Sequence, residues 1–259
     1  MTPHPVHLHP AFLGPALAHR GLHDRAAGRV ENSPAAITAA VAAGYGVELD
    51  VQLSADGEAM VFHDAALGRL TGESGPVAAR AAADLGRIAL TGGGGETIPT
   101  LAQILSLVAG RAALLVEIKD QGGALSPLGV GPLERRVAAL LADYAGPVAV
   151  MSFNPHAVIE MARLAPALPR GLTACGPDAY DETHLGEAER AALADMRLYD
   201  AAGACFCSYD HHALPTPQTA ALRARGHAVL CWTLRDPQAE AAARRHADNV
   251  TFEGYRPPH

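Results

Sequence analysis

Short apolar segments recur along this chain, separated by longer segments of helical character. The clearest one runs from Gly46 to Leu53, where apolar and polar residues alternate, as expected for a strand whose two faces differ. Similar short runs predict seven further strands, at Pro15–Ala18, Ala113–Ile118, Pro147–Ser152, Gly171–Cys175, Ala204–Ser208, Ala228–Leu234 and Asn249–Glu253.

Helices are predicted between these strands. Capping residues and prolines mark their first turns, as at Ser33 and Pro34, and Gly44 follows the end of the first one. The predicted helices are Pro34–Ala43, Thr100–Ala109, Pro132–Tyr144, Pro155–Leu164, Glu187–Ala201, Pro217–Arg225 and Pro237–His246. Strands that alternate with helices pair in parallel. Eight such units in about 250 residues are typical of an α/β fold of the (β/α)8 TIM-barrel type, so we expect one domain over residues 1–259.

Residues 54–99 do not follow this alternation. Ser54–Gly57 has the composition of a turn, Glu58–His63 that of a second extended segment, and Ala78–Leu85 that of a short alanine-rich helix. Four consecutive glycines, Gly92–Gly95, lack the preceding strand and the following Lys-Ser/Thr of a phosphate-binding loop, which favours a surface loop. We therefore expect a small insertion after the second strand.

Composition narrows the classes of function. The formal net charge is −7, the isoelectric point is about 6.0 and aromatic residues make up 5%, which argues against a nucleic acid partner. The first residues lack the basic start and apolar run of a signal peptide, and no apolar stretch has the length of a membrane span. The four cysteines fall in apolar runs and are predicted to be buried free thiols. These features favour a cytoplasmic protein without stable membrane insertion; they do not indicate an oligomeric state.

Carboxylates interrupt two of the apolar strands. Glu48 and Asp50 lie two residues apart and so share one face of their strand, with Cα atoms roughly 6–7 Å apart. Glu117 lies near the end of the next barrel strand. At the separation of Glu48 and Asp50, two carboxylates would repel each other by about 2–3 kcal/mol at an effective dielectric constant near 20. Because TIM-barrel active sites lie at the C-terminal ends of the strands, these three residues predict a site for Mg²⁺ or Ca²⁺, which prefer oxygen ligands.

Other polar residues fall at the same predicted rim. His19 and Arg20 follow the first strand, His63 ends the second extended segment, Lys119 follows Ala113–Ile118, and Trp232 lies near the end of Ala228–Leu234. The two imidazoles have the right chemistry for a general acid and base near neutral pH, and the two cations for binding phosphate. Structural alternatives stay open: Lys119 could serve only to pair with a neighbouring carboxylate, His63 could be a surface residue, and Trp232 could belong to the core.

Taken in order, the motifs resemble a known family, the glycerophosphodiester phosphodiesterases. The segments that carry the resemblance are A-H-R-G at 18–21, E-N-S at 31–33, V-E-L-D-V at 47–51, D-G at 56–57, F-H-D at 62–64, L-G-R-L-T-G at 67–72, I-P-T-L at 98–101, V-E-I-K at 116–119, S-F at 152–153 and W-T at 232–233. The resemblance implies a TIM-barrel enzyme that uses a divalent cation to hydrolyse glycerophosphodiesters to glycerol 3-phosphate and an alcohol.

The resemblance also implies a role for most of the candidate residues. Matched by motif, the roles are catalysis for His19 and His63, cation binding for Glu48, Asp50 and Glu117, and phosphate contact for Arg20 and Lys119. In the scheme usual for the family, a glycerol hydroxyl of the substrate attacks phosphorus. A cyclic phosphate forms and is then hydrolysed, with the two histidines exchanging roles. The small-molecule phosphodiester is the only partner this implies.

The last predicted strand departs from the family pattern. The family usually reads D-G-I-I-T-D-x-P, whereas this chain reads D-N-V-T-F-E-G-Y-R-P from Asp248 to Pro257. The barrel rim at this strand therefore differs from the rim usual for the family, and this difference affects which alcohol the enzyme prefers.

Two alternative functions stay open. A phospholipase D-like enzyme acting on lysophospholipids would need an apolar groove beside the site. A noncatalytic barrel that binds phosphorylated ligands would lack a key histidine or carboxylate, and none is missing.

Overall fold

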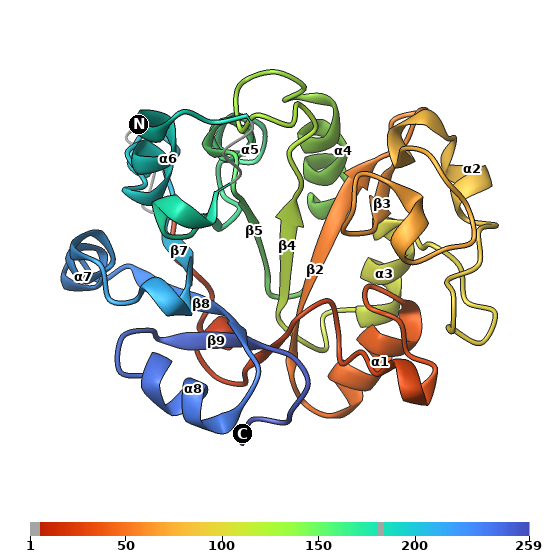
Figure 1. The fold of residues 1–259 in the computed structure, drawn as a ribbon, viewed down its shortest axis with the longest axis horizontal. Helices are drawn as coiled ribbons and strands as arrows, with labels where there is room; N and C mark the ends of the chain where they lie inside the picture. Colours follow the sequence, from red (N-terminus) through yellow and green to blue (C-terminus); the bar gives the residue numbers. More distant parts are fainter. Residues whose placement is uncertain (1–5, 181–183, 259) are drawn as a thin grey trace.

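Eight parallel strands close into a barrel in the computed structural model, which describes residues 6–180 and 184–258 (Figure 1). They follow the chain order around the ring, and β1 closes it by pairing with both β2 and β9. The predicted (β/α)8 architecture is confirmed. The strands are β1 (Leu17–Ala18), β2 (Gly46–Leu53), β4 (Leu114–Ile118), β5 (Val148–Ser152), β6 (Arg170–Ala174), β7 (Phe206–Asp210), β8 (Ala228–Leu234) and β9 (Asn249–Phe252).

Helices surround the ring on the outside (Figure 1). The α-helices are α1 (Pro34–Ala42), α2 (Ala82–Leu85), α3 (Leu101–Val108), α4 (Pro132–Leu141), α5 (Pro155–Leu164), α6 (Glu187–Ala194), α7 (Pro217–Ala224) and α8 (Pro237–Ala243). Short 3-10 helices are η1 (Pro10–Phe12), η2 (Arg25–Ala27), η3 (Leu67–Arg69), η4 (Val77–Ala79), η5 (Pro177–Ala179) and η6 (His211–Ala213). The predicted helix Glu187–Ala201 is too long, because the chain leaves the helical conformation after Asp195 and Met196 has a left-handed φ of 51°.

The alternation along β2 and β4 sorts side chains between two environments. Val47, Leu49 and Val51 point outward and pack in the core formed with the helices. Residues of the other parity, such as Leu115, point into the barrel, where they pack with Phe206 and other residues near the N-terminal ends of the strands. Burying a side chain of this size contributes about 1.5–3 kcal/mol. The same parity turns Glu48, Asp50 and Glu117 toward the barrel axis.

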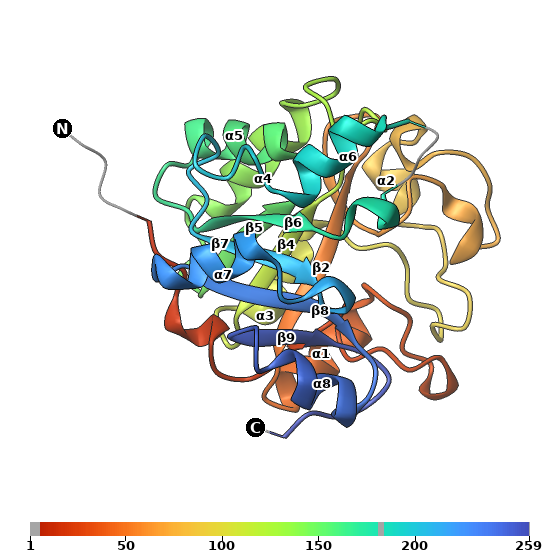
Figure 2. The ribbon, with the colours of Figure 1, turned by 60° about the vertical axis from the view of Figure 1, so that its left-hand side comes forward.

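The insertion begins with β3 (Ala59–Val61), which pairs antiparallel with β2. It lies to one side of the ring with α2 (Figure 2). The predicted helix at Ala78–Leu85 is found only in its second half, as α2. It is divided into η4 and α2 by Arg80, whose backbone is extended (φ −119°) and whose carbonyl accepts a hydrogen bond from Ala55 N at 2.8 Å. Asp56 then accepts from Ala82 N at 2.8 Å at the start of α2. A small core of its own supports the insertion, including Met60, Phe62, Leu67, Leu70, Val77, Leu85, Ile88, Leu90 and Ile98.

Two further predictions concern the chain as a whole. The four cysteines are free and buried, as predicted. Across residues 6–180 and 184–258, none of the helices combines the length and the hydrophobicity needed to cross a bilayer.

Gly171 tests the packing inside the barrel. A Cβ atom there would lie 2.5 Å from the ring of Phe206, which is fully buried. We expect Gly171→Ala to lower the free energy of unfolding by about 1–3 kcal/mol, as overpacking of a closed core does, measured by urea denaturation. Gly72→Ala is the control, since nothing lies within 4 Å of its Cβ position. Equal stability of the two variants would show that the barrel interior yields at this point.

Candidate active site

Three buried carboxylates meet at the C-terminal end of the barrel. The parallel register of β2 and β4 places Asp50 directly opposite Glu117, and Glu48 lies one inward position earlier on β2. One oxygen from each lies within 4.8 Å of the other two, and the side chains are buried. The proximity predicted from the two-residue spacing is therefore found.

Two residues in left-handed conformations hold these carboxylates from the β1 side. Arg20 (φ 55°) donates its backbone N–H to Glu48 Oε2 at 3.0 Å, and its Nε lies 3.3 Å from Asp50 Oδ2 without hydrogen-bond alignment. Asn32 (φ 60°) donates Nδ2 to Asp50 Oδ2 at 2.9 Å, and its Oδ1 accepts from Asp50 N at 3.3 Å. Such backbone conformations are uncommon outside glycine and cost free energy. The contacts to the carboxylates offset that cost.

Lys119 lies between two of the carboxylates. Its Nζ is 2.8 Å from Asp50 Oδ1 and also donates to Glu117 Oε1. Burial raises the pKa of Glu48 well above its usual value, and the charges of Asp50 and Glu117 raise it further. Burial would raise the pKa of Asp50 too, but the charge of Lys119 and of nearby cations holds it below the usual range. The negative charge of Asp50 is thus balanced by nearby cations, whereas the surroundings of Glu48 lack enough positive charge to balance it.

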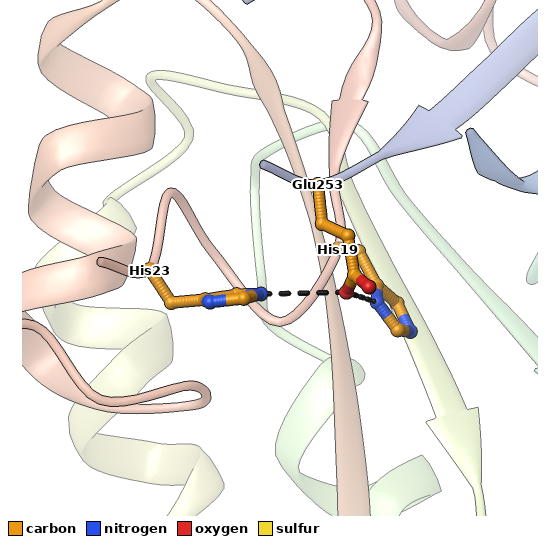
Figure 3. Close-up of side chains that lie close together, drawn as sticks. All are labelled: His19, His23 and Glu253. Carbon is orange, nitrogen blue, oxygen red and sulfur yellow. Dashed lines mark hydrogen bonds and ion pairs between the residues drawn. The ribbon is translucent and has the colours of Figure 1, made fainter. Parts of the chain in front are cut away.

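His19 is held by a carboxylate from the last strand (Figure 3). Its Nδ1 lies 2.7 Å from Oε2 of Glu253, just after β9, and the same oxygen lies 3.5 Å from Nε2 of His23. Arg235 Nε donates to the other oxygen of Glu253 at 2.8 Å. The second ring nitrogen of His19, Nε2, is 4.0 Å from Glu48 Oε2. Burial lowers the pKa of His19, which favours the neutral imidazole.

His63, two residues after the end of β3, has a similar set of partners. Its Nδ1 lies 2.6 Å from Asp64 Oδ1, and Arg69 Nε donates to Asp64 Oδ2 at 2.6 Å. Arg69 also bonds Glu31 at 2.7 and 2.8 Å. Gln52 on β2 donates to the backbone carbonyl of His63 at 2.8 Å, which ties this residue to the barrel rim. Each histidine therefore faces a carboxylate that is itself held by an arginine.

Trp232 lines a pocket beside the carboxylates and is only half-buried. Its Nε1 donates to Ser208 O at 3.0 Å, and its ring meets that of Phe153 edge to face at a centroid distance of 5.5 Å. The pocket measures about 450 Å³ and is also lined by Glu117 and Lys119. The pocket-lining interpretation of Trp232 thus fits better than the core one.

Several residues at the site carried no prediction. Asn32 and Asp64 lie within the quoted motifs E-N-S and F-H-D, but no role was assigned to either. Glu253 ends the last strand, so the strand-end rule that identified Glu117 could have found it. Arg69 lies within the quoted motif L-G-R-L-T-G, but no role was assigned to it, and Arg235 lies outside the quoted motifs.

Comparison with known proteins decides the family. A sequence profile of the glycerophosphoryl diester phosphodiesterase family matches residues 19–251. This chain belongs to that family. The family, the fold and the enzyme class of a phosphodiester hydrolase, each predicted from the sequence, are thereby confirmed.

Individual relatives agree with this membership. A glycerophosphodiester phosphodiesterase from Caldanaerobacter subterraneus subsp. tengcongensis is 31% identical over 164 residues, spanning 60% of this chain and 65% of that protein. The structure of an Oleispira antarctica phosphodiesterase, in complex with the product sn-glycerol-3-phosphate, aligns over 95% of both chains with a TM-score of 0.76 and 24% identity. The glycerophosphodiester phosphodiesterase from Thermotoga maritima aligns over 91% of this chain and 92% of its own, with a TM-score of 0.69 and 25% identity.

Glu31 provides a pH test of the arginine network. Burial would raise its pKa, but bonds to Arg69 and to Arg20 lower it from 4.5 to about 2. A carboxyl group whose pKa is lower in the folded state than in the unfolded state stabilises the protein at a pH above the unfolded-state pKa. That stabilisation is lost as the pH falls toward the folded-state pKa. A pKa shift of this size corresponds to about 3 kcal/mol, which solvent screening of this partly exposed group reduces. We therefore expect Glu31→Gln to be about 2 kcal/mol less stable than the wild type near neutral pH, with the gap closing between about pH 4.5 and 2.

Urea denaturation at several pH values measures this gap. Glu73→Gln is the control, because Glu73 pairs with Arg80 on the surface with half of its side chain exposed, and such pairs contribute little. A gap at Glu31 that is constant with pH would mean that its charge is not the stabilising element.

Proposed function

We propose that this protein hydrolyses glycerophosphodiesters to glycerol 3-phosphate and an alcohol, with a divalent cation and two histidines. The observation that carries the proposal is the arrangement around the buried carboxylates: two imidazoles, each fixed through Nδ1 by a carboxylate. Membership of the family supports the reaction class. Both ends of the chain contribute, since the groups lie on or just after β1, β2, β4 and β9 and in the insertion, which supports one catalytic domain.

The donor set fits a hard divalent cation. Glu48, Asp50 and Glu117 offer oxygens close enough to share one ion. The pKa of Glu48 is raised first by burial and then by the charges of Asp50 and Glu117, which Arg20 offsets only in part. When bound, the cation would polarise the phosphoryl oxygens and stabilise charge developing there. Six to eight oxygen ligands suit Ca²⁺, whereas Mg²⁺ prefers octahedral geometry with several waters; the three carboxylates are compatible with both.

His19 is suited to remove the first proton. Ionised Glu253, whose pKa is lowered first by its hydrogen bond with His19, accepts a hydrogen bond from Nδ1–H of His19, so Nε2 is left as the basic nitrogen. In the proposed step the glycerol hydroxyl attacks phosphorus and transfers its proton to His19 Nε2. Arg20 and Lys119, beside the carboxylates, orient the phosphate oxygens.

His63 is suited to protonate the leaving alcohol. Asp64 is ionised, because bonds to Arg69 and His63 lower its pKa against the effect of burial, and it stabilises a positively charged imidazole next to it. The bond from phosphorus to the alcohol oxygen breaks as His63 gives that oxygen a proton. Water then opens the cyclic phosphate: His63 accepts the proton of the water, and His19 returns a proton to the glycerol oxygen.

The lysophospholipid alternative is not favoured. It requires an apolar groove that can hold an acyl chain beside the site, whereas the pocket there measures about 450 Å³ and is lined by Glu117, Asp120 and Asp210 as well as by aromatic rings. The large apolar side chains exposed in residues 6–180 and 184–258 are Leu13 and Leu128. Only Leu128 lies in the loop that follows β4. The binding-only alternative is not favoured either, since both histidines and all three carboxylates are in place.

Release of glycerol 3-phosphate from glycerophosphocholine and glycerophosphoglycerol tests the reaction directly. We expect turnover with Mg²⁺ or Ca²⁺, none with a chelator, and a loss of about 10²–10⁴-fold in His19→Ala and in His63→Ala, as for general acid–base groups. Glu48→Gln combined with Asp50→Asn should abolish cation binding in calorimetry. Near-normal turnover in either histidine variant would remove that residue from the mechanism. Turnover that survives the chelator would refute the role of the cation.

Glu253 is expected to act as a positioning residue for His19. Glu253→Gln keeps the size of the side chain but removes the charge that stabilises protonated His19. We expect kcat/KM to fall about 10–100-fold, as for other residues that orient a reacting histidine, and its acidic limb to move to lower pH. His23→Ala is the matched control: it removes the weaker contact to the same oxygen and leaves the His19–Glu253 bond intact. An unchanged pH profile in Glu253→Gln would leave this residue a purely structural role.

A further inference from the structure

The pocket beside the carboxylates is placed to hold one half of a bound diester. It lies across the ends of β4 to β8 and shares Glu117 and Lys119 with the carboxylate cluster. A phosphate held by the cluster would therefore extend one of its two substituents into this space. The pocket measures about 450 Å³, enough for a small alcohol.

Aromatic rings form one wall of the pocket. Phe153 meets Trp232 and Tyr180 edge to face, with centroid distances of 5.5 and 6.3 Å. The polar atoms of the outer two rings are engaged by the main chain: Trp232 Nε1 donates to Ser208 O, and Tyr180 Oη accepts from Cys175 N at 3.4 Å. The rings therefore offer a ligand chiefly their π surfaces, which attract cations.

The charges around the pocket favour a cation as well. Three acidic residues, Glu117, Asp120 and Asp210, line it, and Lys119 is the sole basic residue among the described residues that do so. The ammonium of Lys119 is already paired with Glu117 and Asp50. The charge left over in the pocket is thus negative.

Asp210 is the carboxylate best placed to meet a ligand. It ends β7, and its side chain is 17% exposed. Its Oδ1 accepts from His212 N at 3.0 Å and pairs with His212 Nδ1 at 2.9 Å. Among the described residues, no donor bonds its Oδ2. By contrast, Asp120 accepts hydrogen bonds through both oxygens, from Asn154 at 2.8 Å and Leu125 N at 3.0 Å.

We propose that this pocket binds the alcohol half of the substrate and selects alcohols that carry an ammonium group, such as choline or ethanolamine. The inference rests on the proposed function and names its substrate class. Trp232, Phe153 and Tyr180 contact the cation through their rings, and Asp210 supplies the opposite charge. The glycerol half then lies toward His19, whose Nε2 takes the proton of the attacking hydroxyl.

The test compares esters that differ only in the charge of the alcohol. Glycerophosphocholine and glycerophosphoethanolamine are measured against glycerophosphoglycerol, with saturating cation and near pH 8, where exposed imidazoles are neutral. We expect kcat/KM to favour the two ammonium esters about 10-fold in the wild type. Asp210→Asn and Trp232→Leu should each reduce this preference to about 2-fold or less, mainly by raising KM for the ammonium esters.

The variants are chosen so that folding does not obscure the result. Asp210→Asn is isosteric and keeps an oxygen that can accept from His212 N. Asp178→Asn is the matched control, since Asp178 is exposed on η5 and does not line the pocket; its preference should equal that of the wild type. Circular dichroism confirms that each variant is folded before its rates are compared.

The outcomes separate this inference from the proposed function. No preference for ammonium esters in the wild type overturns the inference while leaving the hydrolysis intact. An equal loss for all three esters in Asp210→Asn also overturns it, because the pocket would then hold the glycerol half that they share. No release of glycerol 3-phosphate from any ester would instead reject the proposed function.

Discussion

The structure of the barrel mouth depends on balancing the negative charges of three buried carboxylates with nearby cations. Burying an unpaired carboxylate costs several kcal/mol, so Glu48, Asp50 and Glu117 can share one site only because Arg20 and Lys119 reach them. This requirement explains local features that would otherwise be unfavourable. The chain after β1 adopts a left-handed conformation at Arg20 because that turn directs its backbone N–H at Glu48. The remaining charge imbalance is what a divalent cation would correct.

The fold could be predicted because its signals are local and repeated. Strands and helices alternate with different periods, and eight repetitions leave few other architectures. The errors fell where tertiary contacts override local propensity. The alanine-rich segment Ala78–Leu85 has the composition of one helix, but the turn at Ala55 and Asp56 bonds its backbone and divides it. Likewise, β7 runs on to Asp210 because it pairs with β8 as far as Trp232.

The site was predicted only in part, and the division has a physical origin. Glu48, Asp50, Glu117 and Lys119 lie on or just beyond strands, so their spacing determines which side chains meet. The strand-end rule could have placed Glu253 at the rim, but its pairing with His19 depends on β9 closing onto β1, a contact between the two ends of the chain that no local pattern encodes. The arginines that hold the carboxylates next to the histidines act from irregular segments, where sequence spacing says little about distance.

The antiparallel pairing of β2 with β3 has a consequence for the evolution of the enzyme. One hairpin carries Glu48, Asp50 and His63, and its own hydrogen bonds, from Phe62 N to Asp50 O and from Gln52 to His63 O, fix their relative positions. Residues 65–98 leave this hairpin and return beside it, so the part between the L-G-R-L-T-G and I-P-T-L motifs can change in length or sequence without displacing the reacting groups. Arg69, in the first of these motifs, has to stay in place, since it bonds Asp64. Divergence among relatives can thus accumulate in this segment as long as one arginine is retained.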